Sequence, residues 1–352
     1  ILARFPYDAD AAEAVGTMRL GRGDTQGALV AYRHSLELRP HQPELRAKIQ
    51  ALDTARSDFA AAWRIEPSTL RAKAPGPAPE AGDLLLDQRV TRVYPGGTGE
   101  TWSQVVFRAG KSSKDRYFSL DYDPTLRSVT TLSARRLRPD GTVLETAEIE
   151  DVDASGGQGL YFEQRTSRVH FSDLEPGDLV AVEQLLSDFA DNPFGGMYGD
   201  IAGLQWLEPC ALARVVWLVP QVLALHIGKS TPELRVRTET TGEVQTVVVE
   251  REAVPKIDPE PGMPGYTEVA DYVHATSLAD WPAVGAWFRK LAGNLLDPTP
   301  EVEALAREIA GEAADDEAKL ARLFDCVARK IRYVGLEFGV HGYKPYGVQA
   351  TL

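Results

Sequence analysis

The chain has 352 residues, of which 43% are hydrophobic and 25% are charged, a composition that excludes disordered, collagen-like and small disulfide-stapled proteins. At roughly 150 residues per domain, this length predicts two to three domains. Asp and Glu total 51 against 38 for Lys and Arg, a net charge of -13, which argues against nucleic acid or anionic lipid as the main partner.

Residues 1–73 are rich in helix formers and predict a helical arm. Small residues stand where two helices would touch, an acidic residue can cap the second helix, and a proline can end it. A further helix is expected over 43–52. The spacing resembles a tetratricopeptide repeat, with a plain helical hairpin as the alternative, and such an arm would bind a peptide or protein partner. The residues that carry this spacing are Gly16, Asp24, Ala28, Tyr32 and Pro40.

Two proline-rich segments, 74–83 and 251–268, are expected to be connections, because proline fixes φ and removes a hydrogen-bond donor. Between them, residues 84–250 alternate between apolar and polar with period two and carry frequent turn signals. This pattern predicts an antiparallel β-sandwich. The expected fold class is therefore a multidomain α+β protein.

Residues 269–352 return to helical periodicity. Helices are expected over 281–291, from Pro300 as a first helical residue, and from Asp315 to Ile331. The chain then enters a glycine-rich loop that reaches Tyr343.

Three short motifs in the strand region, at 138–141 (RPDG), 174–178 (LEPGD) and 217–220 (WLVP), are followed by LFDCVARKIRYVGLEFG at 323–339 and GYKP at 342–345. The last two resemble the opening of a bacterial transglutaminase-like domain. The strand motifs are similar to the uncharacterised β-rich family that precedes such domains. The resemblance implies that 269–352 is the N-terminal part of a transglutaminase-like α/β domain.

In the transglutaminase-like superfamily a cysteine at a helix N-terminus is the nucleophile, and a histidine and an aspartate assist it. The resemblance places the lead-in to that cysteine at 347–352, so we expect the chain to stop before the triad and to contain no catalytic residue. Glu337, His341 and Tyr343 lie in the loop expected beside the cleft and are candidates for substrate contact.

The two cysteines present are expected to be structural. Cys326 falls mid-helix, where the helix dipole gives a thiolate little support. Cys210 precedes an apolar run and is typical of a buried small hydrophobe. The histidines show no metal-ligand spacing. Acidic pairs such as Asp121 and Asp123 lack the ligand series of a calcium loop, so no metal or cofactor is expected.

For the complete protein the resemblance implies thiol acyl chemistry, the hydrolysis or transfer of peptide amide and acyl groups. The alternative is a non-catalytic envelope scaffold or a protein- or glycan-binding module. The tryptophans at 102, 206 and 217 would line a groove in that alternative and are otherwise core residues. Residues 211–227 are too interrupted to span a membrane, and no signal peptide is visible. A periplasmic or envelope location follows from the resemblance alone.

Overall fold

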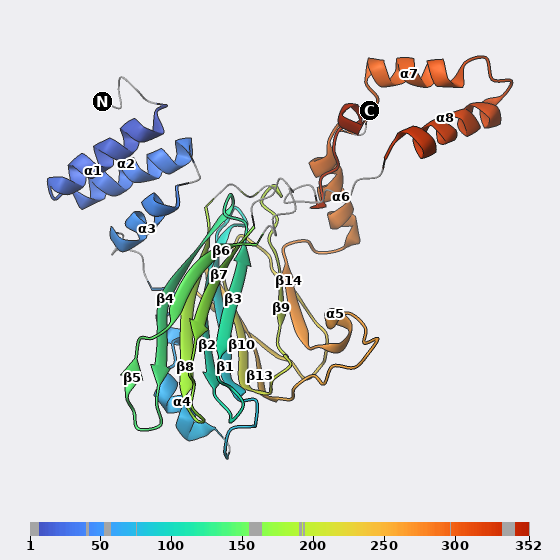
Figure 1. Ribbon diagram of the computed structural model, residues 1–352. Coiled ribbons are helices and arrows are strands. Elements are labelled where there is room, and N and C mark those ends of the chain that lie inside the picture. The colour runs from blue at the N-terminus through green and yellow to red at the C-terminus, as the bar shows by residue number, and fades with distance from the viewer. Residues whose placement is uncertain are drawn as a thin grey trace. The chain divides into compact units, whose positions relative to one another are not determined.

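The computed structural model describes residues 7–39, 42–52, 58–74, 76–154, 164–189, 192, 194–295, 297–332 and 342–351. It contains both helices and several β-sheets (Figure 1), as expected of the α+β class. Two compact units divide the chain: one holds Ile1–Asn192 with Tyr198–Ser277, and the other holds Pro193–Met197 with Leu278–Leu352. The first unit extends to Ser277, beyond the end of the strand region expected at 250.

The first helices are α1 (Ala9–Gly21), α2 (Thr25–Leu38) and α3 (Pro43–Leu52). The predicted cap of the second helix is confirmed, because the Asp24 carboxylate accepts a hydrogen bond from the Gly27 amide at 2.9 Å. Tyr32 of α2 is buried against Gly16 of α1. The expected helix over 43–52 is confirmed, whereas the assignment to the tetratricopeptide class stays a prediction. Pro40 lies outside the described residues.

Among the described residues, the strands form one sheet of eight, in the order β12-β13-β10-β1-β2-β8-β4-β5, and two sheets of three, β11-β14-β9 and β3-β7-β6. We call the first the large sheet. The strands are β1 (Asp83–Val93), β2 (Gly99–Arg108), β3 (Arg116–Tyr122), β4 (Arg127–Leu137), β5 (Val143–Leu144), β6 (Glu148–Asp153), β7 (Arg165–Phe171), β8 (Leu179–Asp188), β9 (Gly199–Gly203), β10 (Cys210–Pro220), β11 (His226–Lys229), β12 (Arg235–Thr241), β13 (Val244–Val254) and β14 (Tyr272–Thr276).

One pairing differs from the antiparallel arrangement that we expected: β1 and β10 run parallel, with Leu84 opposite Cys210 and Arg92 opposite Leu218. A parallel pair requires a long connection, since the chain must return to the end at which the first strand began. Here β2 to β9 supply that connection, and the large sheet is consequently mixed.

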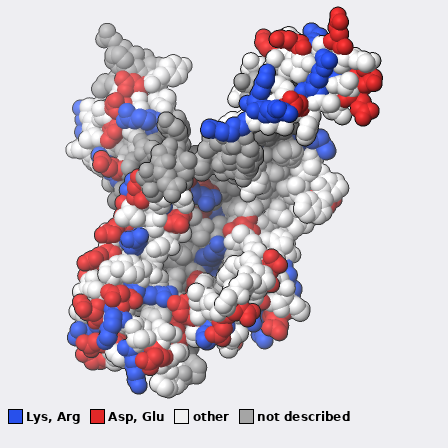
Figure 2. Space-filling model, turned by 45° about the vertical axis from the view of Figure 1, so that its right-hand side comes forward, with Lys and Arg blue, Asp and Glu red and all other residues white. Residues whose placement is uncertain are grey.

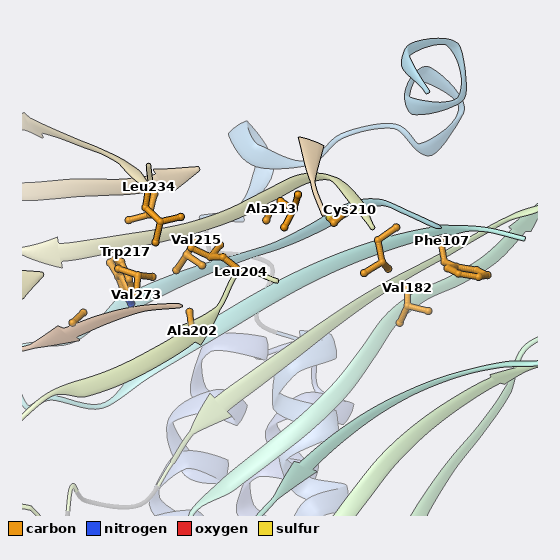
Figure 3. Packing of buried hydrophobic residues seen from close by; sticks show 14 of the residues in the cluster. Phe107, Val182, Ala202, Leu204, Cys210, Ala213, Val215, Trp217, Leu234 and Val273 are labelled. Carbon is orange, nitrogen blue, oxygen red and sulfur yellow. The ribbon is translucent and has the colours of Figure 1, made fainter. Parts of the chain in front are cut away.

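The central strands of the large sheet are buried on both faces. Its inner face packs against the two small sheets, so that Trp217 and Val215 of β10 share one apolar cluster with Ala202 of β9 and Val273 of β14 (Figure 3). Its outer face packs against residues 58–74 through two smaller clusters. Burial on both faces explains why nearly every residue of β8 is buried, rather than every second residue.

Residues 58–74 contain a short 3₁₀ helix, Ala61–Trp63, and α4 (Pro67–Lys73). They were expected within the helical arm, but Ala60 and Leu70 are buried against the large sheet. We call residues 58–74 the covering segment.

The second unit contains the three expected helices, which are confirmed as α6 (Trp281–Ala292), α7 (Pro300–Ala310) and α8 (Asp316–Lys330). Side chains of Asp280, Thr299 and Asp315 cap their N-termini. Two short helices complete the described structure, α5 (Tyr266–Val269) in the first unit and α9 (Val348–Thr351) in the second. No helix in the described part of the chain is long and apolar enough to cross a membrane.

Candidate functional site

Tyr343 is the one sequence-predicted site residue that the structure describes. Its ring is 57% exposed and lies edge-on to Phe194 and Trp287, with ring centroids 5.2 and 5.9 Å away. The Trp287 indole N–H donates to the Phe194 carbonyl at 2.8 Å, which fixes the indole. Tyr343 therefore packs against two other rings while more than half of the residue stays exposed, and its contact with a substrate stays a prediction. Glu337 and His341 lie outside the described residues.

Neither cysteine has the surroundings of an activated thiol. Cys210 opens β10 and is buried, and this burial, with the nearby Asp87 carboxylate, raises the pKa of its thiol above the ordinary range. A nucleophilic thiol needs the opposite shift. Cys326 lies in the middle of α8, as expected, and is half-buried.

A polar cluster that sequence reasoning missed lies on the inner face of the large sheet, where residues of all three sheets converge. We call it the inner polar site. Its members are Asp87 and Arg89 of β1, Arg116 of β3, Asp200 of β9, and Glu208, which precedes β10.

Asp200 holds one side of the inner polar site. Its Oδ2 accepts hydrogen bonds from Arg89 at 2.7 Å, the Trp217 indole at 2.9 Å and the Tyr198 hydroxyl at 3.4 Å. Burial, followed by the Asp200 charge, raises the pKa of Tyr198 above its ordinary range, so this hydroxyl remains a neutral donor. These bonds tie β9 to β1 and β10.

Arg116 holds the other side. It donates to Glu208 at 2.5 Å and lies over the Phe107 ring with its guanidinium carbon 4.4 Å from the centroid. The buried Nε groups of Arg116 and Arg89 have no hydrogen-bond acceptor among the described residues. The two side chains remain partly exposed, at 28% for Arg89 and 23% for Arg116, so their other guanidinium N–H groups can donate to a polar group that reaches them.

Asp87 lies between these two arginines. Burial raises the pKa of its carboxyl group to about 6, against the lowering influence of Arg89 and Arg116. A carboxyl group with a shifted pKa beside two cations is a common attribute of binding and catalytic sites. The sequence signal was available, because Asp87 and Arg89 occupy alternate positions, and hence one face, of an otherwise apolar strand.

Other predicted features have ordinary structural positions. Trp102 and Trp217 are fully buried, and Trp206 packs against the core. Asp121 accepts from Thr166, and no cluster of three metal-ligating side chains occurs among the residues that the structure describes. A pocket of about 260 Å³ between β4 and β6 has Glu145 as its single ionisable lining residue. Acidic and basic side chains intermix over the described part of the visible surface (Figure 2).

The sequence model of one family matches residues 97–258, and the family is described as a domain of unknown function with a solved structure, DUF3857. No curated protein matches the chain. The matched range begins after β1 and so omits Asp87 and Arg89, although β1 is an internal strand of the large sheet.

Among solved structures, the fold is similar to that of a protein from Parabacteroides distasonis described as a putative protease, with a TM-score of 0.59 and 15% identity. The similarity covers 75% of this chain and 53% of that protein, so the chain spans about half of its length. At this identity the likeness shows the fold alone.

Two further structures align with TM-scores too low to support an argument. A protein from Legionella pneumophila described as a putative nutrient binding protein has a TM-score of 0.28 at 8% identity, and the alignment covers 76% of this chain and 92% of that one. An M1 zinc metallopeptidase from Deinococcus radiodurans has 0.29 at 12% identity, covering 57% and 43%. Residues 97–258 thus match the DUF3857 family, within a fold similar to that of the Parabacteroides protein.

Proposed function

We propose that the chain is the binding and positioning part of a transglutaminase-like protein, which as a whole hydrolyses or transfers peptide amide and acyl groups through a cysteine thioester. Support comes from the motif at 323–345 and from the fold shared with a protein described as a putative protease. In this proposal the cysteine, histidine and aspartate of the triad belong to another part of the whole protein.

The inner polar site is the observation that carries the binding role. It combines a carboxyl group whose pKa is about 6 with two partly exposed arginines whose Nε groups lack acceptors among the described residues. A peptide group offers one donor and one acceptor, and an extended peptide offers them repeatedly. Arg89 and Arg116 can donate to carbonyl oxygens, while Asp87 can accept from an amide.

The state of the cysteines supports a non-catalytic role for this part. Cys210 is buried with a raised thiol pKa. We therefore expect the 352-residue chain to leave peptide amide substrates intact, and a thiol alkylating reagent to modify Cys326 well before Cys210. Hydrolysis of a peptide amide by this chain, abolished by Cys210→Ser, would contradict the proposed division of labour.

Binding is tested by titrating the chain with a library of blocked peptides and, separately, with a panel of polysaccharides. We expect peptides to bind and Arg116→Gln to weaken them roughly tenfold, which corresponds to one charge-assisted hydrogen bond. The matched control is Arg235→Gln, since Arg235 is exposed on β12, far along the sheet order from β1. Thermal melting of both variants separates lost binding from lost folding.

The outcomes distinguish the candidate functions. Peptide binding that Arg116→Gln leaves unchanged overturns the assignment of the inner polar site. Saturable polysaccharide binding without peptide binding favours the glycan-binding module instead. The proposed periplasmic or envelope location and a partner for α1–α3 rest on resemblance, and cell fractionation and affinity capture test them.

A further inference from the structure

A second polar group lies on the opposite, outer face of the large sheet, and it is independent of the inner polar site. Five side chains form a row across five neighbouring strands, joined by the register pairs Gln88 with Gln104, Gln104 with Glu183, Gln88 with Arg214, and Arg214 with Glu250. Gln88 and Gln104 are fully buried. We call these five residues the outer row.

The main chain of the covering segment bonds the two buried glutamines of the outer row. The Gln104 carboxamide accepts from the Ile65 amide at 3.1 Å and donates to the Ile65 carbonyl at 2.7 Å. Gln88 donates to the Trp63 carbonyl at 2.9 Å and to Gln104 at 2.8 Å. A single glutamine side chain thus pairs with both polar groups of one residue, as a neighbouring β-strand would.

Side chains of the covering segment fit sites on either side of the outer row. Ala60 is buried in a cluster with Trp102 of β2 and Val216 of β10. Leu70 enters a second cluster with Leu86 and Val106. Between them Arg64 donates to Glu183 at 2.8 Å and lies over the Trp102 ring.

We propose that this outer face is a binding site for a peptide that is extended where it crosses the outer row, and that the covering segment is its intramolecular occupant, which a peptide of the same pattern can replace. Gln88 and Gln104 contact main-chain atoms, which every peptide has, while the two apolar clusters and Glu183 select an aliphatic, a basic and a further aliphatic side chain in order. Four of the five members of the outer row lie within the DUF3857 match at 97–258, whereas the occupant lies outside it.

The test uses the full chain with a specific protease site inserted between Pro77 and Ala78, a point where Pro77 is exposed. After cleavage, a fluorescent synthetic peptide of residues 58–74 is added and its binding followed by anisotropy. We expect saturable binding that displaces residues 1–77 and that unlabelled peptide reverses. Gln104→Ala should weaken it roughly tenfold or more, through the loss of two hydrogen bonds.

The matched control is Gln221→Ala, because the Gln221 side chain bonds the Gly242 carbonyl in a turn away from the outer row. Failure of the peptide to bind a cut chain that retains its circular dichroism overturns the proposal, as does equal binding to the Gln104→Ala and Gln221→Ala chains. Hydrogen exchange on the uncut chain is a second measurement: excess peptide should speed exchange in residues 58–74 and leave β8 unchanged. An unchanged rate in residues 58–74 counts equally against the proposal.

Discussion

The pKa of Asp87 reflects two opposing influences of its surroundings. It lies next to Arg89 and Arg116, which favour its ionised form, yet burial prevails and raises its pKa from 3.8 to about 6. A carboxyl group that binds its proton more tightly in the folded chain than in the unfolded chain destabilises the fold as pH rises between those two values. Asp87 is therefore retained at a cost in stability, as is common for residues with a role in binding.

The substitution Asp87→Asn makes this loss of folding stability measurable. At pH 4 the carboxyl group is protonated in the folded chain and roughly half ionised in the unfolded chain, so the variant and the parent chain should differ little in stability. Above about pH 6 the variant should be more stable, by up to about 3 kcal/mol at about 1.4 kcal/mol for each unit of pKa difference, and by less where solvent screens the charge.

Thermal melts at pH 4, 5, 6 and 7 check this expectation, with Asp297→Asn as the control because Asp297 is exposed. A stability difference between Asp87→Asn and the parent chain that stays constant with pH would show that the Asp87 pKa is unshifted.

At the scale of elements, the contact between α1 and α2 depends on the absence of one side chain. A Cβ atom at Gly16 would lie 2.4 Å from the Tyr32 ring, well inside contact distance, and Tyr32 is buried. The helices can approach this closely only because Gly16 has no side chain.

Gly16→Ala should accordingly destabilise α1 and α2 by about 1–3 kcal/mol, as overpacking does. Gly21→Ala, in the same helix with no atom within 4 Å of the added Cβ, should instead stabilise by about 0.5–1 kcal/mol. Urea unfolding followed by helical circular dichroism measures both. Equal effects of the two substitutions would mean that the α1–α2 contact is not tight at Gly16.

The helices were largely predictable because their signals are local. Asp24, Thr299 and Asp315 each stand immediately before a helix and cap it in the structure. The packing of the covering segment against the large sheet was not predicted, since composition indicates a tendency to form helices but not the surface against which a segment packs. The parallel β1–β10 pair was equally hidden, because period two indicates a strand but not its partner.

The candidate site was less predictable than the elements. The inner polar site draws Asp87, Arg116 and Asp200 from strands that are far apart in sequence, and topology alone brings them together. Tyr343 was proposed as a site residue through a resemblance, and that role stays a prediction. Its aromatic neighbours, Phe194 and Trp287, were not proposed, since Phe194 lies far from Tyr343 in the sequence.

At the scale of the whole molecule, one buried ion pair joins the turn motif at 174–178 to the end of β4, just before the motif at 138–141. Asp178, from the motif at 174–178, is fully buried and accepts from Arg136 at 2.8 Å. Arg136 also donates to the Asp173 carbonyl at 2.9 Å. Asp178 further accepts from the Glu175 amide, so it closes its own turn while it holds β4 to β8.

Asp178→Ala should cost about 3–5 kcal/mol, because it leaves a buried guanidinium without its counter-charge. Asp140→Ala, in the turn motif at 138–141, is the comparison: Asp140 is exposed and bonds the Thr142 amide, which lowers the pKa of its carboxyl group, and its loss should change stability little. The denaturant midpoints of the two variants, compared with that of the parent chain, measure these changes in stability. A small effect of Asp178→Ala would show that solvent reaches Arg136.

The parallel β1–β10 pair also determines the order in which a growing chain can be completed. β1 can pair with β2 as soon as both have left the ribosome, but its other edge waits for β10, whose first residue pairs with Leu84. At about 5–20 residues per second, that wait is on the order of ten seconds. Throughout it the nascent chain carries an uncovered apolar strand edge, the kind of surface on which chaperones act and aggregates begin. During synthesis, aggregation can therefore begin at β1 in the middle of the large sheet rather than at the edge strands of the finished sheet.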